Sequence, residues 1–117
     1  MKGMKIGIDF GSSSLKIYTE KKGLVVNEPS IVAIDSESGN PIAFGQAADM
    51  VYGRCGDDIT ITKIINNGIV SDFVMAERML RYYIQRVCGN RIYKPNIILS
   101  LPTNVSGLEK TTLLDVV

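Results

Sequence analysis

The chain has 117 residues, with 13 lysines and arginines against 12 aspartates and glutamates, no histidine and two cysteines. A hydrophobic content of 45% and a charged content of 21% are typical of one globular domain. The net charge of +1 argues against a nucleic-acid partner, and the lack of histidine excludes a histidine-based triad or metal site. Cys55 and Cys88 are too few for a zinc site or a disulfide scaffold, so both are expected to stay reduced. No signal peptide or membrane-spanning run is recognisable.

Alternating apolar residues predict a series of short strands at the start of the chain. Strands are expected over residues 5–10, 15–20 and 24–26, because apolar side chains recur there at every second position. The third strand should stop before Pro29, since proline cannot donate a hydrogen bond to a neighbouring strand. The apolar residues of 30–35 predict a fourth strand.

The middle of the chain mixes strands with one short helix. A polar turn leads into a short strand at 41–44, and residues 46–52 favour a helix that ends at a glycine-containing loop over 53–58. The β-branched residues of 59–65 predict another strand. A turn is expected at 66–68, because asparagine and glycine tolerate left-handed backbone angles.

The last part of the chain predicts a helix, a strand and a second helix. Asp72 is suited to cap a helix whose apolar residues recur at helical spacing over 73–87, and Gly89 is a typical residue after a helix C-terminus. Residues 96–101 are nearly all apolar, as in a strand that is buried on both faces. A capping box at 106–109 opens a final helix that has no stop signal. We therefore expect the sequence to be cut from a longer protein.

A turn of one glycine and three serines follows the first strand, which ends in an acid. Gly11 lets a ligand approach the backbone closely, and the N–H groups of Ser12 and Ser13 can face phosphate oxygens. Asp9 can orient a hydrated Mg²⁺ ion, and the ammonium group of Lys16 can reach a phosphate. An ordinary hairpin turn is the alternative interpretation. No P-loop or dinucleotide-binding glycine motif is present.

Three further features have both a functional and a structural interpretation. Glu109 can polarise a water molecule from the start of the last helix, or it can serve only as the helix cap with Ser106. Asp72 is a third acid, and N-capping is the favoured interpretation. Ile92 and Tyr93, which lie between an arginine and a lysine, can insert at a membrane surface or fold back on the preceding helix.

Five segments occur in an order that resembles the N-terminal part of MreB, the family of bacterial actins that determines rod shape. The Asn-Glu-Pro-Ser block and its distance from the Asp-x-Gly-Ser turn are specific to that family. Asp-x-Gly-Ser alone is shared by the wider superfamily of actins, heat-shock chaperones and sugar kinases. The resemblance covers essentially the whole chain, and its segments are 6–12, 27–35, 67–73, 79–84 and 101–110.

The resemblance implies a fold of the α/β class, the actin-like ATPase (ribonuclease H-like) fold. The chain would form subdomain I, a mixed sheet with flanking helices and a small inserted subdomain. Residues 1–33 and 70–117 would make up subdomain IA, truncated at its C-terminal end. Residues 34–69 would form the inserted subdomain IB.

The resemblance also implies a function for the longer parent protein. That protein would be a cytoskeletal, ATP-binding protein, with Mg²⁺ as the metal cofactor, that forms membrane-associated filaments and determines cell shape. It would be an ATPase, whereas these 117 residues alone would be inactive. Its partners would be other copies of itself, the inner membrane surface, and cell-wall synthesis and morphogenesis proteins, with no nucleic acid. It would lie in the cytoplasm, peripheral to the inner face of the cell membrane.

The same resemblance gives roles to the candidate residues. The first phosphate motif of the family falls on Asp9, Gly11, Ser12 and Ser13, with Asp9 reaching Mg²⁺ through water. Eukaryotic actin has a lysine at the position of Lys16. The acid proposed to polarise the hydrolytic water falls on Glu109, and the apolar loop that contacts the membrane falls on Ile92 and Tyr93.

Two alternatives to a cell-shape filament remain at this point. One is another actin-like ATPase, such as a plasmid-partition filament or a chaperone-like reactivase. The other is a stand-alone binding module without nucleotide, which applies if the gene ends near residue 117.

Overall fold

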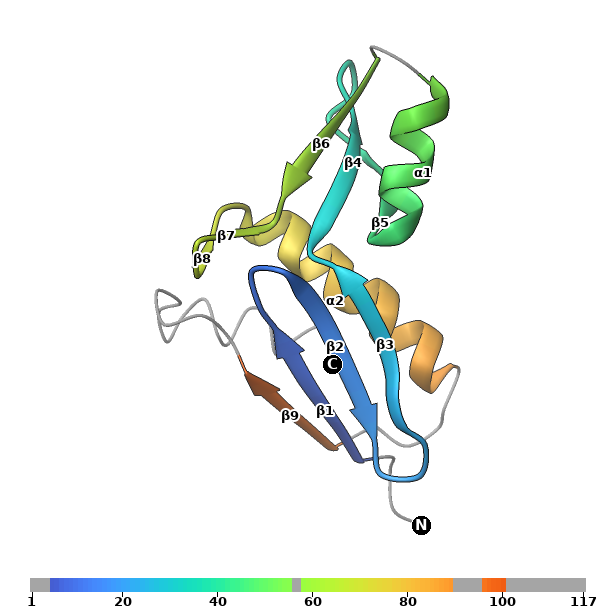
Figure 1. Cartoon of the computed structure of the whole chain (residues 1–117), viewed down its shortest axis with the longest axis vertical. Helices are drawn as coiled ribbons and strands as arrows, with labels where there is room; N and C mark the ends of the chain where they lie inside the picture. The colour runs from blue at the N-terminus through green and yellow to red at the C-terminus, as the bar shows by residue number, and fades with distance from the viewer. Residues whose placement is uncertain (1–4, 56–57, 90–95, 101–117) are drawn as a thin grey trace.

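The structure is a computed structural model that describes residues 5–55, 58–89 and 96–100 (Figure 1). In these ranges the strands form three sheets, with orders β3-β2-β1-β9, β5-β4-β6 and β7-β8. Figure 1 places the second sheet with α1 above the first sheet, and α2 behind the first sheet. The chain therefore has a larger part that contains the first sheet and α2, and a smaller part that contains the second sheet and α1.

The first sheet is a three-stranded meander extended by a later strand. Strands β1 (Lys5–Phe10), β2 (Ser14–Thr19) and β3 (Gly23–Pro29) run antiparallel, and β9 (Asn96–Ser100) pairs in parallel with β1. The strands predicted over residues 5–10, 15–20, 24–26 and 96–101 are confirmed as elements of this sheet. The prediction that the third strand ends before Pro29 is wrong. Pro29 pairs with Ser14 at the end of β3, and β3 is an edge strand of the described sheet, where a missing N–H is tolerated.

The second sheet is antiparallel and is covered by a helix. It consists of β4 (Ile31–Asp35), β5 (Pro41–Phe44) and β6 (Ile59–Lys63). Because β4 begins at Ile31, the boundary expected between residues 33 and 34 falls inside this strand.

Helix α1 (Gln46–Cys55) is longer than expected. The prediction of a loop from Gly53 onward is wrong, since the helix continues for three more residues. A glycine inside a helix costs about 1 kcal/mol relative to alanine, which lowers the local helix propensity without preventing the helix.

The segment that returns to the first sheet is kinked. The single strand expected over 59–65 is wrong, because β6 ends at Lys63 and β7 (Ile65–Asn66) pairs separately with β8 (Ile69–Val70). Ile64 and Ile65 are both fully buried. Successive side chains of a regular strand point to opposite faces, so burying two neighbours in one core requires the break. The predicted turn is confirmed by positive φ angles at the asparagine and glycine that join β7 to β8.

Helix α2 (Phe73–Cys88) has the clearest helix signals in the sequence, and both of its predicted ends are confirmed. The Asp72 side chain accepts a hydrogen bond from the Met75 N–H at 3.1 Å, which is the predicted N-cap. The chain leaves the helix at Gly89, whose φ is 63° and whose N–H donates to the Gln85 carbonyl at 2.7 Å.

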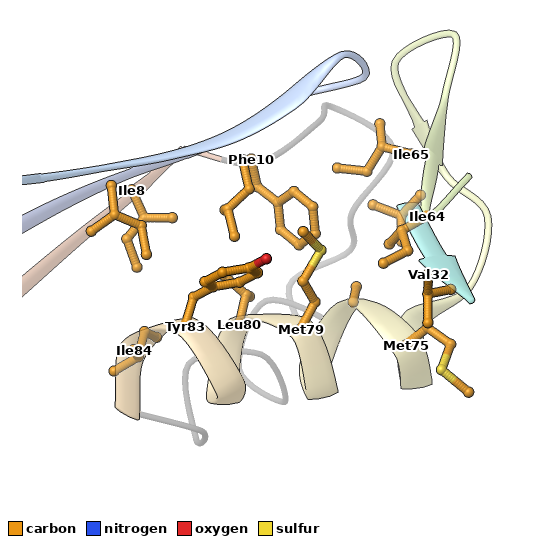
Figure 2. Close-up of a cluster of buried hydrophobic side chains, with 14 of the residues drawn as sticks. Ile8, Phe10, Val32, Ile64, Ile65, Met75, Met79, Leu80, Tyr83 and Ile84 are labelled. Atoms are coloured by element: carbon orange, nitrogen blue, oxygen red, sulfur yellow. The ribbon is translucent and has the colours of Figure 1, made fainter. Parts of the chain in front are cut away.

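The main core lies between α2 and the first sheet and extends under the start of the second sheet. Figure 2 shows Ile8 and Phe10 from β1 facing the side chains of α2. Val32, Ile64 and Ile65, which come from the segments that cross to the second sheet, complete the same cluster. This core therefore links the two parts of the chain, and a second, smaller cluster of Ala33, Ala48 and Ile59 lies within the smaller part. Helix α2 contributes Met75, Ala76, Met79, Leu80, Tyr83, Ile84 and Cys88.

The opposite face of the first sheet is open in the described part of the chain. Ile97 and Leu99 of β9 pack partly against the core, whereas Ile98 between them is 80% exposed. The expectation of a strand buried on both faces is therefore wrong for the described residues, because they cover β9 only on the face of Ile97 and Leu99. Beside Ile98, Gly7 and Tyr18 line a cleft of about 550 Å³.

Candidate functional site

The turn from β1 to β2 holds the residues predicted to bind phosphate. The Gly11 N–H donates to the Ser14 carbonyl at 3.0 Å, which closes the turn. Ser12 and Ser13 lie at its tip and are exposed. Figure 1 shows this turn at the end of the β1–β2 hairpin nearest to the second sheet.

The turn presents backbone donors. Within the part of the chain that the structure describes, the N–H groups of Ser12 and Ser13 have no hydrogen-bond partner. A Cβ atom added at Gly11 would lie 3.7 Å from the Ser14 carbonyl and 3.9 Å from the Asp9 carboxylate, which are ordinary contacts. The folded turn alone does not need glycine at this position. A ligand that approaches the backbone closely would need it.

Asp9 and Lys16 lie at the base of the turn on one face of the sheet. They are direct partners in the β1–β2 register, and Asp9 is also aligned with Ser100 of β9. Their neighbours Ile8 and Phe10 point into the core, so the two charged side chains point to the opposite face. Among the described residues the one ion pair joins Glu77 and Arg81, so Asp9 and Lys16 form no ion pair with each other or with another described residue.

The turn is supported from outside by two contacts that could not be predicted from the sequence. The Ser30 hydroxyl donates to the Gly11 carbonyl at 2.7 Å. The Gly68 N–H, in the β7–β8 turn, donates to the Ser12 hydroxyl oxygen, also at 2.7 Å. These partners are 19 and 56 residues apart in the sequence. The one local signal was the position of Ser30, a hydroxyl residue between Pro29 and an apolar strand.

The other candidates are separate from this turn. The Asp72 carboxylate is used as the N-cap of α2, so the structural interpretation of this residue is confirmed. Glu109, Ile92 and Tyr93 lie outside the described residues. Within the described ranges no group of three potential metal ligands comes together. A metal at this turn would thus rely on Asp9 and on ligand or water oxygens.

The arrangement matches solved structures of actin-like proteins. MreB5 of Spiroplasma citri bound to ADP matches with a TM-score of 0.76 and 27% identity, over 97% of this chain and 34% of that chain. The same protein bound to AMPPNP gives a TM-score of 0.75. A MamK double helical filament gives 0.74 at 16% identity, which supports the fold alone. The fold is therefore the actin-like one, with a mixed sheet and flanking helices.

Sequence comparison narrows this class to one family. The MreB/Mbl protein family matches residues 3–117, so the chain belongs to the MreB/Mbl family. It is 36% identical to the cell shape-determining protein Mbl of Bacillus cereus over 109 residues, and 30% identical to the cell shape-determining protein MreB of Escherichia coli over 114 residues. The match covers 92% of this chain and 33% of each relative. The chain thus spans about a third of the curated relatives, and the resemblance found in the sequence is confirmed.

Proposed function

We propose that this chain is the N-terminal part of an ATP-binding, actin-like cytoskeletal protein that forms membrane-associated filaments and determines cell shape. The observation that carries the proposal is the turn after β1, where two N–H groups without a partner in the described part of the chain lie beside Asp9 and Lys16. Family membership supports it, as do the MreB5 structures that contain ADP or AMPPNP. The MamK structure, which shares the fold, is a double helical filament.

The turn supplies the phosphate contacts in this proposal. The N–H groups and hydroxyls of Ser12 and Ser13 donate to phosphate oxygens, and Gly11 leaves room for the ligand. The Lys16 ammonium adds a positive charge on the same sheet face. Bound Mg²⁺ would neutralise phosphate charge, and one exposed carboxylate such as Asp9 suits an ion that keeps most of its waters. Asp9 holds those waters by accepting their hydrogen bonds.

Asp9→Ala in the whole gene product tests the proposed phosphate site. Titration with ATP in the presence of Mg²⁺ and in excess EDTA should show that the wild type binds more tightly with the metal. The variant should lose this difference, because Asp9 is the carboxylate that orients the metal-bound waters. Glu37→Ala, on an exposed turn of the smaller part, is the control and should bind as the wild type does. Equal metal dependence in Asp9→Ala and the wild type would contradict the assignment.

Hydrolysis is assigned to Glu109, which would polarise the attacking water from the start of the last helix. Glu109→Gln should keep ATP affinity and slow hydrolysis, because glutamine can still cap a helix but is a poorer base. A normal hydrolysis rate in this variant would leave Glu109 as a cap only.

Membrane contact is assigned to Ile92 and Tyr93. This contact would be peripheral. No helix in the described part of the chain is long and apolar enough to cross a bilayer. Each buried side chain contributes roughly 1.5–3 kcal/mol, and repetition along a filament strengthens the sum. Filaments of the whole protein should therefore sediment with anionic liposomes. Joint replacement of both residues by serine should remove the sedimentation and keep polymerisation, and retained binding would refute the assignment.

The remaining parts of the proposal follow from the family. We assign residues 1–33 and 70–117 to subdomain IA, and 34–69 to the inserted subdomain IB. The protein would act in the cytoplasm at the inner face of the cell membrane. Its partners there would be cell-wall synthesis and morphogenesis proteins.

A further inference from the structure

The carbonyl group of Gly11 is fixed by a residue that lies outside the turn. Ser30 is 1% exposed, and its hydroxyl donates to the Gly11 carbonyl oxygen at 2.7 Å. Such a short bond between a buried hydroxyl and a carbonyl restricts rotation of the peptide unit that carries the carbonyl. That unit is the one that joins Gly11 to Ser12.

The direction of one donor of the turn follows from this bond. No peptide bond in the described part of the chain is cis, so the Gly11 carbonyl and the Ser12 N–H point in opposite directions. The carbonyl points toward buried Ser30. The Ser12 N–H consequently points away from the protein interior, on the exposed side of the turn, and it is one of the two donors there that have no partner among the described residues.

Ser30 is itself held in place from two sides. It lies between the end of β3 at Pro29 and the start of β4 at Ile31, where the chain passes from the first sheet to the second. Its carbonyl accepts the Ile64 N–H at 2.9 Å, in the segment that returns from the second sheet. The backbone that carries the hydroxyl is therefore fixed by both connections between the two parts of the chain, the one from β3 to β4 and the one that returns through Ile64.

We propose that Ser30 is a positioning residue for nucleotide binding, because it holds the Gly11–Ser12 peptide with the N–H directed at a phosphate. This inference rests on the proposed function. Ser30 does not touch the nucleotide; it acts through the peptide that does. Preorganised backbone donors bind an anion without reorganisation, so the affinity for the phosphate groups depends on this hydroxyl.

A purely structural role for Ser30 makes a different prediction. If the hydroxyl only satisfies a buried carbonyl, Ser30→Ala should lower stability and should affect all ligands alike. If it positions the peptide, the variant should lose affinity for ATP and keep its affinity for adenosine, which has no phosphate. The comparison of these two ligands separates the roles.

The test uses the whole gene product and calorimetric titration with ATP and with adenosine. Ser30→Ala should weaken ATP binding by about three- to tenfold and leave adenosine binding unchanged. Ser30→Cys keeps the size of the side chain and a weaker donor, so its loss for ATP should be smaller. Thr19→Val is the matched control. It removes a buried hydroxyl that accepts the Lys22 N–H at 3.0 Å, and this bond lies at the other end of the same sheet.

The outcomes are distinct. Unchanged ATP affinity in Ser30→Ala, or equal losses for ATP and adenosine, would overturn the inference and leave the proposed function standing. Failure of the wild-type protein to bind ATP would overturn both.

In the ligand-free protein, nuclear magnetic resonance supplies a signature of the bond itself. The Gly11 carbonyl carbon and the Ser12 amide should shift in Ser30→Ala and stay in place in Thr19→Val, and unchanged shifts in both would refute the role of Ser30.

Discussion

Gly11 is a residue that the fold does not require but that the proposed phosphate site does. Its backbone has no positive φ, and an added Cβ would make only ordinary contacts with the turn. Gly11→Ala should leave the free energy of unfolding unchanged or raise it by up to about 1 kcal/mol, through the unfolded state. ATP affinity of the whole protein should fall at least about tenfold, because the methyl group occupies the space of the phosphate. Urea unfolding and calorimetry measure the two effects, and an unchanged ATP affinity would contradict the phosphate site.

Among the described residues, Tyr83 is the one whose ionisation is coupled most clearly to folding. Burial raises the pKa of its phenol, and the neighbouring Glu28 carboxylate raises it further. The hydroxyl proton is shared between Glu28 at 3.2 Å and the Phe44 carbonyl at 3.3 Å. The neutral Tyr83 hydroxyl therefore stabilises the folded state. Because its pKa is raised on folding, this stabilisation is fully present below the unfolded pKa of about 10 and is lost as pH rises above it.

The coupling predicts a stability loss in alkali that depends on this hydroxyl. The free energy of unfolding should fall between about pH 10 and pH 12 in the wild type. Tyr83→Phe should be less stable at pH 8, because it leaves the Glu28 carboxylate without this donor, and its decline in alkali should be shallower. Urea titrations at several pH values give both slopes. Parallel slopes would show that Tyr83 does not contribute to the alkaline loss.

At the scale of elements, the contact between α2 and the smaller part depends on Gly45. Its φ is 65°, and an added Cβ would meet the Tyr83 hydroxyl and lie 2.9 Å from the Glu28 Cβ. The Glu28 carboxylate also accepts the N–H of Gln46 at the start of α1, at 3.3 Å. Close by, the ring centroids of Phe44 and Tyr82 are 5.7 Å apart. One glycine therefore allows β3, α1 and α2 to meet.

Gly45→Ala should be one of the most destabilising small substitutions in this chain. The clash and the strained φ together should lower the free energy of unfolding by at least about 2 kcal/mol. Gly39→Ala is the matched control, because Gly39 has a φ of 75° but nothing lies within 4 Å of an added Cβ. The control should cost about 1 kcal/mol, from the backbone angle alone. Equal losses in urea unfolding of the two variants would show that the crowding at Gly45 does not matter.

The sequence predicted those elements whose signals are local. The alternation in β1 and β2 and the caps of α2 depend on residues within a few positions of each other, and these elements were placed correctly. The kink at Ile64 and the exposure of Ile98 depend on which parts of the chain lie beside them, and no local pattern contains that information. The same holds for the site: the turn from Asp9 was visible, whereas Ser30 and Gly68 reach it only through the fold.

For the whole molecule, the chain spans about a third of the relatives' length and contains one turn that we propose to bind phosphate. Ligand pockets usually enclose most of a ligand's surface, and a single turn encloses little of an adenosine. The 117-residue chain alone should therefore bind Mg-ATP with a dissociation constant of about 1 mM or weaker. Calorimetric titration of this chain measures the constant. Low-micromolar affinity would show that these residues contain a nearly complete site.

The turn between β1 and β2 is proposed to bind the phosphates of a nucleotide. A crystal structure of the whole gene product with Mg²⁺ and AMPPNP tests it most directly. Phosphate oxygens should lie at about 3 Å from the N–H groups of Ser12 and Ser13, with the Ser30 hydroxyl still bonded to the Gly11 carbonyl. A nucleotide bound with its phosphates away from this turn, and with both N–H groups facing solvent, would contradict it.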